Sequence, residues 1–304
     1  MKDHAFLFPG QGSQQVGMGR ELVEKSSLAK ELFKQADEIL GYSLSRICFE
    51  GPEEELKLTQ NTQPALLTVS TILYRLMEKE PAFAAGHSLG EYSALVCAGV
   101  LRFEDAVLLV HKRGRYMQEA VPVGQGAMAA LIGADIERVR EVAARQEGVV
   151  DLANWNSAQQ IVISGEKAAV EAAVAEIAAP KHVFLPVSAP FHSRMMLPAE
   201  ERLSVDLDAV TFSDPLYPVV ANVTARPVTS GAQARELLKQ QVSRPVLWQP
   251  SMEFLLAEAG IGSYAEVGVG KVLAGLMARI ARDKGLRPQV RNIATLEDIQ
   301  SLAG

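Results

Sequence analysis

A serine between two glycines is the strongest chemical signal in this sequence. Gly86-His87-Ser88-Leu89-Gly90 is a G-x-S-x-G segment, with a predicted strand before it and a predicted helix after it, as in a nucleophile elbow. Such a turn would lift the Ser88 hydroxyl out of a sheet, and the following helix would direct N–H groups toward developing negative charge. For the pentapeptide alone, a glycine-rich turn with a capping serine is an equal alternative. The strand and helix around it favour catalysis.

A serine hydroxyl needs a base within hydrogen-bond reach to act as a nucleophile at neutral pH. Of the five histidines, His192 stands out because Ser188-Ala189-Pro190-Phe191-His192-Ser193 is a loop from which a side chain can project into a cleft. A structural role for His192 remains an equal alternative at this point. The other four are His4, His87, His111 and His182, at positions where a structural or solvated histidine is usual.

The third member of a catalytic triad is not evident. No acidic residue between Ser88 and His192 lies in a predicted loop at the end of a strand, and Asp135 and Asp151 are weak candidates. A dyad whose imidazole is held by a backbone carbonyl fits the sequence equally well.

Arg113 is the candidate for binding an acidic group. It lies in His111-Lys112-Arg113-Gly114-Arg115, on the helix after the predicted elbow helix. Most arginines on such a helix are solvated surface charges. If Arg113 points inward, its planar guanidinium could bind a carboxylate through two parallel hydrogen bonds.

Composition limits the class of protein. With 304 residues, 48% of them hydrophobic, the chain can bury a large core. The net charge of -6 argues against nucleic-acid binding, and no apolar run reaches the roughly 18 residues of a membrane span. Cys48 and Cys97 form no CxxC or Cys/His group, so neither a disulfide framework nor a metal site is expected. We expect a cytoplasmic protein that acts as a monomer.

Strands and helices alternate along most of the sequence, which predicts a mostly parallel sheet. The predicted strands cover residues 5–8, 82–85, 217–223 and 264–267, and the predicted helices cover residues 21–40, 63–80, 91–98, 198–207, 232–241 and 272–283. Between about residues 123 and 192 the order changes to β-α-β-β-α-β, the order of a split βαβ unit. We therefore expect an inserted subdomain.

Several motifs in register resemble the malonyl-CoA:acyl carrier protein transacylase family. The matching segments run from Phe8 to about Leu276, nearly the whole chain: Phe8-Pro9-Gly10-Gln11-Gly12-Ser13-Gln14, Thr62-Gln63-Pro64-Ala65, Gly86-His87-Ser88-Leu89-Gly90-Glu91-Tyr92-Ser93-Ala94, Arg113-Gly114, Gly126-Ala127-Met128-Ala129-Ala130, Asn156-Ser157, Phe191-His192-Ser193 and Glu266-Val267-Gly268. The resemblance implies an α/β fold: an α/β-hydrolase-like large subdomain, residues 1–122 and 193–304, with an inserted ferredoxin-like (βαββαβ) small subdomain, residues 123–192.

The resemblance also implies the roles of individual residues. Ser88 is expected to be the nucleophile, His192 the general base, and the main-chain carbonyl of Gln241 the acceptor that holds His192. The N–H groups of Gln11 and Leu89 are expected to form the oxyanion hole. Residues expected to bind substrate are Arg113, which would take the malonyl carboxylate, with Gln63, Phe191 and His87.

The implied activity is transfer of malonyl from malonyl-CoA to the phosphopantetheine thiol of an acyl carrier protein, through an ester on Ser88. No bound cofactor or metal is expected, because the phosphopantetheine belongs to the partner. Phe191 before His192 is similar to malonyl-selective polyketide acyltransferases, so both fatty-acid and polyketide synthesis stay open. The alternative is an acyl hydrolase on the same scaffold that releases acyl groups from carrier proteins, against which Arg113 argues.

Overall fold

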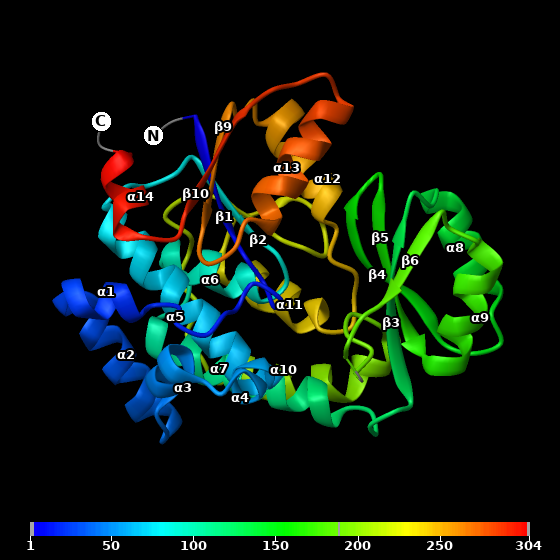
Figure 1. Cartoon of the computed structure of the whole chain (residues 1–304), viewed down its shortest axis with the longest axis horizontal. Helices are drawn as coiled ribbons and strands as arrows, with labels where there is room; N and C mark the ends of the chain where they lie inside the picture. The colour runs from blue at the N-terminus through cyan, green and yellow to red at the C-terminus, as the bar shows by residue number, and fades with distance from the viewer. Residues whose placement is uncertain (1–2, 188, 303–304) are drawn as a thin grey trace.

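The computed structural model describes residues 3–187 and 189–302, and it has an α/β fold built on two separate sheets. Figure 1 shows the larger sheet among most of the helices and the smaller sheet beside it, formed by the green segment in the middle of the chain. Ser188, in the loop expected to carry His192, and the four terminal residues of the expected large subdomain lie outside the described residues.

The larger sheet is mostly parallel, as the sequence predicts. Its strand order is β10-β9-β1-β2-β7-β8, and only the β7–β8 pair is antiparallel. The strands are β1 (His4–Phe8), β2 (Phe83–Gly86), β7 (Val219–Val220), β8 (Pro227–Val228), β9 (Ser263–Val267) and β10 (Gln289–Ile293). The strands β2 and β1 lie at the centre of this sheet, so the elbow after β2 is supported on both sides.

Both faces of the larger sheet are buried. Phe6 and Phe8 on β1 belong to one apolar cluster, whereas Ala5 and Leu7 belong to another on the opposite face, because successive side chains on a strand point to opposite faces. Helices cover both faces: α1 (Arg20–Lys25), α2 (Ser27–Leu40), α3 (Leu44–Glu50), α4 (Glu53–Lys57), α5 (Thr59–Met77), α6 (Leu89–Cys97), α7 (Phe103–Glu119), α10 (Leu197–Asp208), α11 (Gly231–Gln241), α12 (Trp248–Glu253), α13 (Val272–Asp283) and α14 (Leu296–Ser301).

The smaller sheet is antiparallel and comes from one continuous segment. Along the chain its elements are β3 (Gly126–Ile132), α8 (Ile136–Arg145), β4 (Val150–Ser157), β5 (Gln160–Glu166), α9 (Lys167–Ile177) and β6 (Lys181–Phe184). The strand order is β4-β5-β3-β6. A separate apolar cluster lies between this sheet and its two helices, and Figure 1 shows α8 and α9 on the side turned away from the larger sheet.

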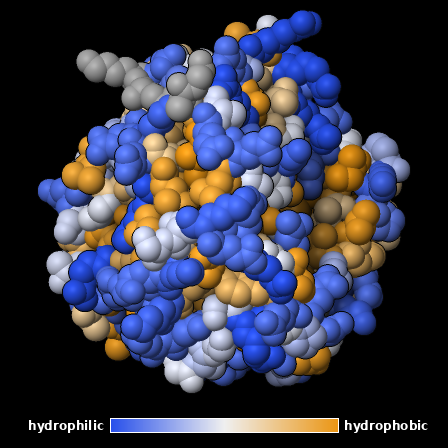
Figure 2. Space-filling model, turned by 60° about the vertical axis from the view of Figure 1, so that its left-hand side comes forward, coloured by the Kyte–Doolittle hydropathy of each residue, from blue (hydrophilic) through white to orange (hydrophobic). Residues whose placement is uncertain are grey.

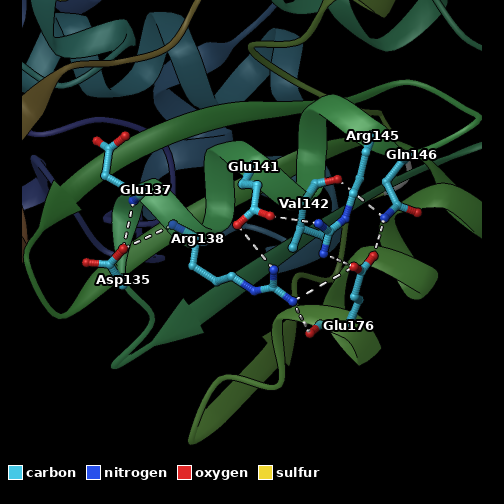
Figure 3. Close-up of polar contacts among 8 residues, drawn as sticks. All are labelled: Asp135, Glu137, Arg138, Glu141, Val142, Arg145, Gln146 and Glu176. Atoms are coloured by element: carbon cyan, nitrogen blue, oxygen red, sulfur yellow. Dashed lines mark hydrogen bonds and ion pairs between the residues drawn. The ribbon is translucent and has the colours of Figure 1, made fainter.

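A network of charged side chains joins α8 to α9 at the surface (Figure 3). Arg145 pairs with Glu141 on its own helix and with Glu176 on α9. Arg138 contacts the same two carboxylates. All four side chains are between 37% and 59% exposed, so water competes for every contact.

Two predicted helices have different bounds in the structure. Residues 21–40 form α1 and α2 rather than one helix, because the Ser26 side chain caps a new helix by accepting from the Ala29 N–H. Helix α5 begins at Thr59, four residues before the predicted start, and carries Pro64 inside it. Proline has no N–H to give the Gln60 carbonyl, and that carbonyl instead meets the His111 ring at 3.0 Å.

The predicted strand 217–223 is much shorter in the structure, where β7 holds two residues.

Figure 2 shows mainly hydrophilic side chains on one face of the molecule, with hydrophobic ones in scattered areas between them. Within residues 3–187 and 189–302, no helix is long and apolar enough to cross a membrane.

Candidate active site

Ser88 lies in a sharp turn between β2 and α6. Its backbone has φ 52° and ψ -105°, a conformation that residues other than glycine rarely adopt. A Cβ on Gly86 would collide with the Gly90 carbonyl group, and one on Gly90 would collide with the Phe8 carbonyl. The two glycines are therefore required by close backbone approach, as in a nucleophile elbow.

The structure brings His192 to Ser88 from 104 residues further along the chain. The Ser88 Oγ lies 2.8 Å from His192 Nε2. His192 also has a positive φ, 57°, and is only 4% exposed. Two non-glycine residues in this region of φ, held face to face by the surrounding fold, are typical of a functional site.

The other ring nitrogen of His192 faces main-chain carbonyls. Nδ1 lies 2.9 Å from the Gln241 oxygen and 3.2 Å from the Arg244 oxygen. Because both partners can only accept, Nδ1 carries the proton, and Nε2 is left free to accept from the Ser88 hydroxyl. Burial, and next the charge of Arg113, lower the pKa of His192 to about 3, so the imidazole is neutral near pH 7.

Neither aspartate considered for a triad takes that place. Asp135 caps α8 by accepting from the N–H groups of Glu137 and Arg138. Asp151 binds the backbone and side chain of Arg194. The arrangement at Ser88 is therefore a dyad supported by backbone carbonyls.

Arg113 is buried beside the serine rather than solvated. It is 1% exposed, and its Nη2 donates to Ser88 Oγ at 3.1 Å and to Gln241 Oε1 at 2.9 Å. Its Nη1 donates to Gln63 Oε1 at 2.8 Å, and the guanidinium lies over the Tyr92 ring. Burial lowers the pKa of Arg113, and its Nε is buried without a partner among the described residues. A buried cation with an unused donor is suited to an anionic ligand.

A pocket joins most of the expected site residues. It is lined by polar residues, namely Gln11, Gln63, His87, Ser88, Arg113, Asn154 and His192, and by apolar residues, namely Leu89, Met117, Met128, Leu185, Val187 and Phe191. Met128 and Leu185 come from the smaller sheet and the loop after it, so both parts of the molecule contribute walls. Apolar walls around one cation favour a ligand with a carboxylate at its end.

Three expected residues occupy different parts of this pocket. Leu89 begins α6, where its N–H has no acceptor within the helix. Gln11 follows β1 and is exposed, with its side-chain amide 3.4 Å from Thr59. His87 binds Asn156 of the smaller sheet at 2.8 Å, and its ring packs near Trp248. Burial lowers the pKa of His87.

Two buried residues behind the elbow, Asn222 and Glu91, were not among the site residues expected from the sequence. Asn222 accepts from the Ser88 N–H at 2.8 Å and donates to the Gly86 carbonyl at 2.7 Å. Glu91, in the first turn of α6, accepts from the Asn222 N–H and from the Gln241 side chain. The available signal was position: Asn222 follows a parallel strand at the same edge of the sheet as the elbow, and Glu91 is one helical turn after Ser88.

No group of three or more histidine, cysteine, aspartate or glutamate side chains that could hold a metal ion is found in residues 3–187 and 189–302. The chemistry available here is that of a serine, a neutral imidazole, a buried guanidinium and backbone N–H groups.

Comparison with known proteins identifies the family. Residues 5–289 match the acyl transferase domain family. The chain is 50% identical to the malonyl CoA-acyl carrier protein transacylase of Bacillus subtilis (strain 168), over 93% of this chain and 92% of the relative. It is 49% identical to the enzyme of that name from Escherichia coli (strain K12), over 92% and 93% of the two chains.

Solved structures of similar proteins resemble this chain in both sequence and fold. The crystal structure of an acyl carrier protein S-malonyltransferase from Vibrio cholerae matches with a TM-score of 0.94 and 41% identity, over 99% of both chains. A malonyl-transacylase in complex with a type II PKS acyl-carrier protein matches with a TM-score of 0.93 and 40% identity, over 98% of both chains. The chain therefore belongs to the acyl transferase domain family and, within it, to the malonyl CoA-acyl carrier protein transacylases.

Proposed function

We propose that this protein transfers a malonyl group from malonyl-CoA to the phosphopantetheine thiol of an acyl carrier protein through an ester on Ser88. The observation that carries the proposal is the position of Arg113, whose Nη2 lies 3.1 Å from Ser88 Oγ in a pocket with one cation and several apolar walls. An apolar pocket rejects a carboxylate unless a cation pairs with it. The relatives named for malonyl transfer support the same substrate.

In the first half-reaction, Ser88 attacks the thioester carbonyl of malonyl-CoA. The hydroxyl proton moves to His192 Nε2 as the Oγ–C bond forms, and the Gln241 carbonyl stabilises the imidazolium through Nδ1–H. The N–H groups of Gln11 and Leu89 receive the oxyanion, each contributing roughly 3 kcal/mol to the transition state. The carbon–sulfur bond then breaks, and the coenzyme A sulfur takes the proton from His192.

The second half-reaction runs the same steps with a different thiol. The phosphopantetheine thiol gives its proton to His192 and attacks the malonyl ester, and Ser88 leaves and recovers the proton from Nε2. Because the first product departs before the second substrate reacts, the kinetics are ping-pong. No bound cofactor takes part, since the phosphopantetheine is carried by the partner.

The remaining pocket residues shape the acyl site. Gln63 holds Arg113 from one side, and Phe191 forms an apolar wall next to His192, where its ring would crowd an α-methyl branch. His87 turns toward Asn156 and lines the same pocket.

A hydrolase would use the same nucleophile but would admit water to the ester. The apolar lining of the pocket works against water, and a buried arginine has no role in releasing uncharged acyl groups. Transfer is the better reading of the site.

We also propose that the two sheets mark two subdomains. The helix-covered parallel sheet with its elbow supports an α/β-hydrolase-like unit over residues 1–122 and 193–304. The element order and the strand order β4-β5-β3-β6 support a ferredoxin-like unit over residues 123–192.

We further propose a cytoplasmic monomer. The two buried free cysteines are in keeping with the cytoplasm. A monomer of 32.8 kDa would elute from size-exclusion chromatography near 33 kDa.

The carrier protein would dock near the pocket mouth at exposed arginines. Arg244 is exposed and its carbonyl contacts His192, whereas Arg194 and Arg226 are exposed but paired with Asp151 and Glu258. Acidic carrier proteins favour such a surface. Charge reversal at Arg244 should raise the KM for the carrier protein at low salt. An unchanged KM would exclude Arg244 from the docking surface.

Intact-mass measurement tests the reaction directly. Wild-type protein incubated with malonyl-CoA should gain one malonyl group, Ser88→Ala should gain none, and addition of holo carrier protein should move the group to the carrier. Adduct on the Ser88→Ala protein, or loss of the adduct to water as fast as to the carrier, would contradict malonyl transfer through Ser88.

A further inference from the structure

We propose that Glu91 is a positioning residue whose carboxylate orients the Gln241 side chain and, through it, holds the Arg113 guanidinium beside Ser88. This inference rests on the proposed function, because the position of Arg113 matters for catalysis only when the acyl group carries a carboxylate. The reaction as described above assigns Glu91 no part.

The carboxylate lies directly behind the elbow and is 2% exposed. Its Oε2 accepts from Gln241 Nε2 at 2.6 Å and from the Asn222 N–H at 3.0 Å. Asn222 in turn binds the Ser88 N–H. One carboxylate oxygen therefore hydrogen-bonds to both segments beside the nucleophile, the segment of Asn222 and the segment of Gln241.

The orientation of the Gln241 amide follows from this contact. A carboxylate can only accept, so it selects the orientation in which Nε2 points toward Glu91. That leaves Oε1 to accept from Arg113 Nη2 at 2.9 Å. The flipped amide would set an NH₂ group against the guanidinium and an oxygen against the carboxylate, two repulsive contacts. The same Nε2 also donates to the Ser88 carbonyl at 3.0 Å.

The charge of Glu91 offsets that of Arg113 without a direct ion pair. Its charge favours the protonated form of Arg113, which lowers the cost of burying a guanidinium. Because Gln241 lies between the two groups, Arg113 keeps donors available for a substrate carboxylate. A carboxylate in direct contact would compete with the malonyl group for those donors.

The ionisation of Glu91 makes this role depend on pH. Burial raises the pKa of Glu91 to about 7, against the hydrogen bonds from Gln241 and the Asn222 N–H and the charge of Arg113 on α7. Tyr92, on the same helix, also interacts electrostatically with Glu91. A protonated Glu91 could donate to Gln241 and would no longer select one orientation of the amide.

The experiment measures single-turnover acylation of Ser88 with malonyl-CoA and with acetyl-CoA. In Glu91→Gln, which keeps the shape and removes the charge, the malonyl rate should fall about 10- to 100-fold, by analogy with the loss seen when the hydrogen-bond partner of a metal ligand is removed. The acetyl rate should fall much less. Glu266→Gln is the matched control: this carboxylate is buried too, but it caps α13 by accepting from the Ala274 N–H, so its loss should leave the ratio of malonyl to acetyl rates unchanged.

A double-mutant cycle with Gln241→Leu tests whether Glu91 acts through Gln241. That variant keeps the main-chain carbonyl that holds His192, and the double variant should be no slower with malonyl-CoA than the slower single variant. Equal losses for malonyl and acetyl, or effects that multiply in the cycle, would overturn the proposal. If Glu91→Gln does not fold, Glu91→Asp, whose side chain is one methylene shorter, takes its place under the same criteria. Failure of the proposed function would differ, because wild-type protein would then gain no malonyl group.

Discussion

Two charged networks in this molecule differ in almost every physical respect. The α8–α9 network of the smaller sheet consists of complementary ion pairs at the surface, with each side chain at least 37% exposed (Figure 3). The network behind Ser88 is buried, and its charges, those of Arg113 and Glu91, meet through the neutral side chain of Gln241. The first satisfies all its charges internally, whereas the second leaves a buried donor without a partner.

The difference indicates what each network is for. Exposed ion pairs are screened by water and salt and contribute little to stability. A buried cation that lacks a direct counter-charge is unfavourable for folding, and such arrangements persist where the unsatisfied group binds something. The buried network therefore supports the proposed ligand site, whereas the exposed one joins two helices at the surface.

The largest expected effect comes from removing the buried cation. Arg113→Ala should lower kcat/KM for malonyl-CoA by about 10²- to 10³-fold, the cost of leaving a buried charge unpaired, while acetyl-CoA is transferred at an equal or higher rate. Steady-state transfer assays with both substrates measure this. Arg115→Ala is the control, an exposed arginine two residues away on the same helix. An unchanged preference for malonyl would remove Arg113 from substrate recognition.

A smaller effect is expected on the pH dependence of stability. Because the pKa of His192 is about 3 in the folded state and about 6.5 in the unfolded state, only the unfolded state takes up a proton between these values. Falling pH therefore destabilises the protein across this window by up to about 1.4 kcal/mol per pH unit from this group. Urea unfolding at pH 5 and pH 7 should show a smaller loss in His192→Gln than in wild type, and equal losses would contradict a neutral buried imidazole.

The smallest effect is expected in the exposed network. Glu176→Gln removes the carboxylate shared by Arg138 and Arg145, yet water can replace both contacts. Neither malonyl transfer nor the melting temperature in 1 M salt should change measurably. A large drop in melting temperature at high salt would mean that these pairs are not screened, and the contrast with the buried network would fail.

Much of the fold follows from local patterns. The alternation of apolar segments predicted the mostly parallel sheet, and α10 and α13 lie within one residue of their predicted bounds. The starts of helices α2 and α5 could not be predicted from the spacing of apolar residues, because the contacts around Ser26 and Pro64 leave no trace in that spacing. The shortened strand β7 reflects pairing with β8, which depends on the tertiary arrangement.

The sequence by itself determined the chemistry that is present: a serine in a glycine-flanked turn, a histidine after a loop, and an arginine on the next helix. These are local features, since turn geometry and residue type are encoded within a few positions. Only the tertiary structure decided that Arg113 is buried beside Ser88, and that Glu91, Asn222 and Gln241 form the network behind the elbow. The contacts of Glu91 with Asn222 and Gln241 join segments more than 100 residues apart. Burial, which sets the charge state of each group, exists only once the chain has packed.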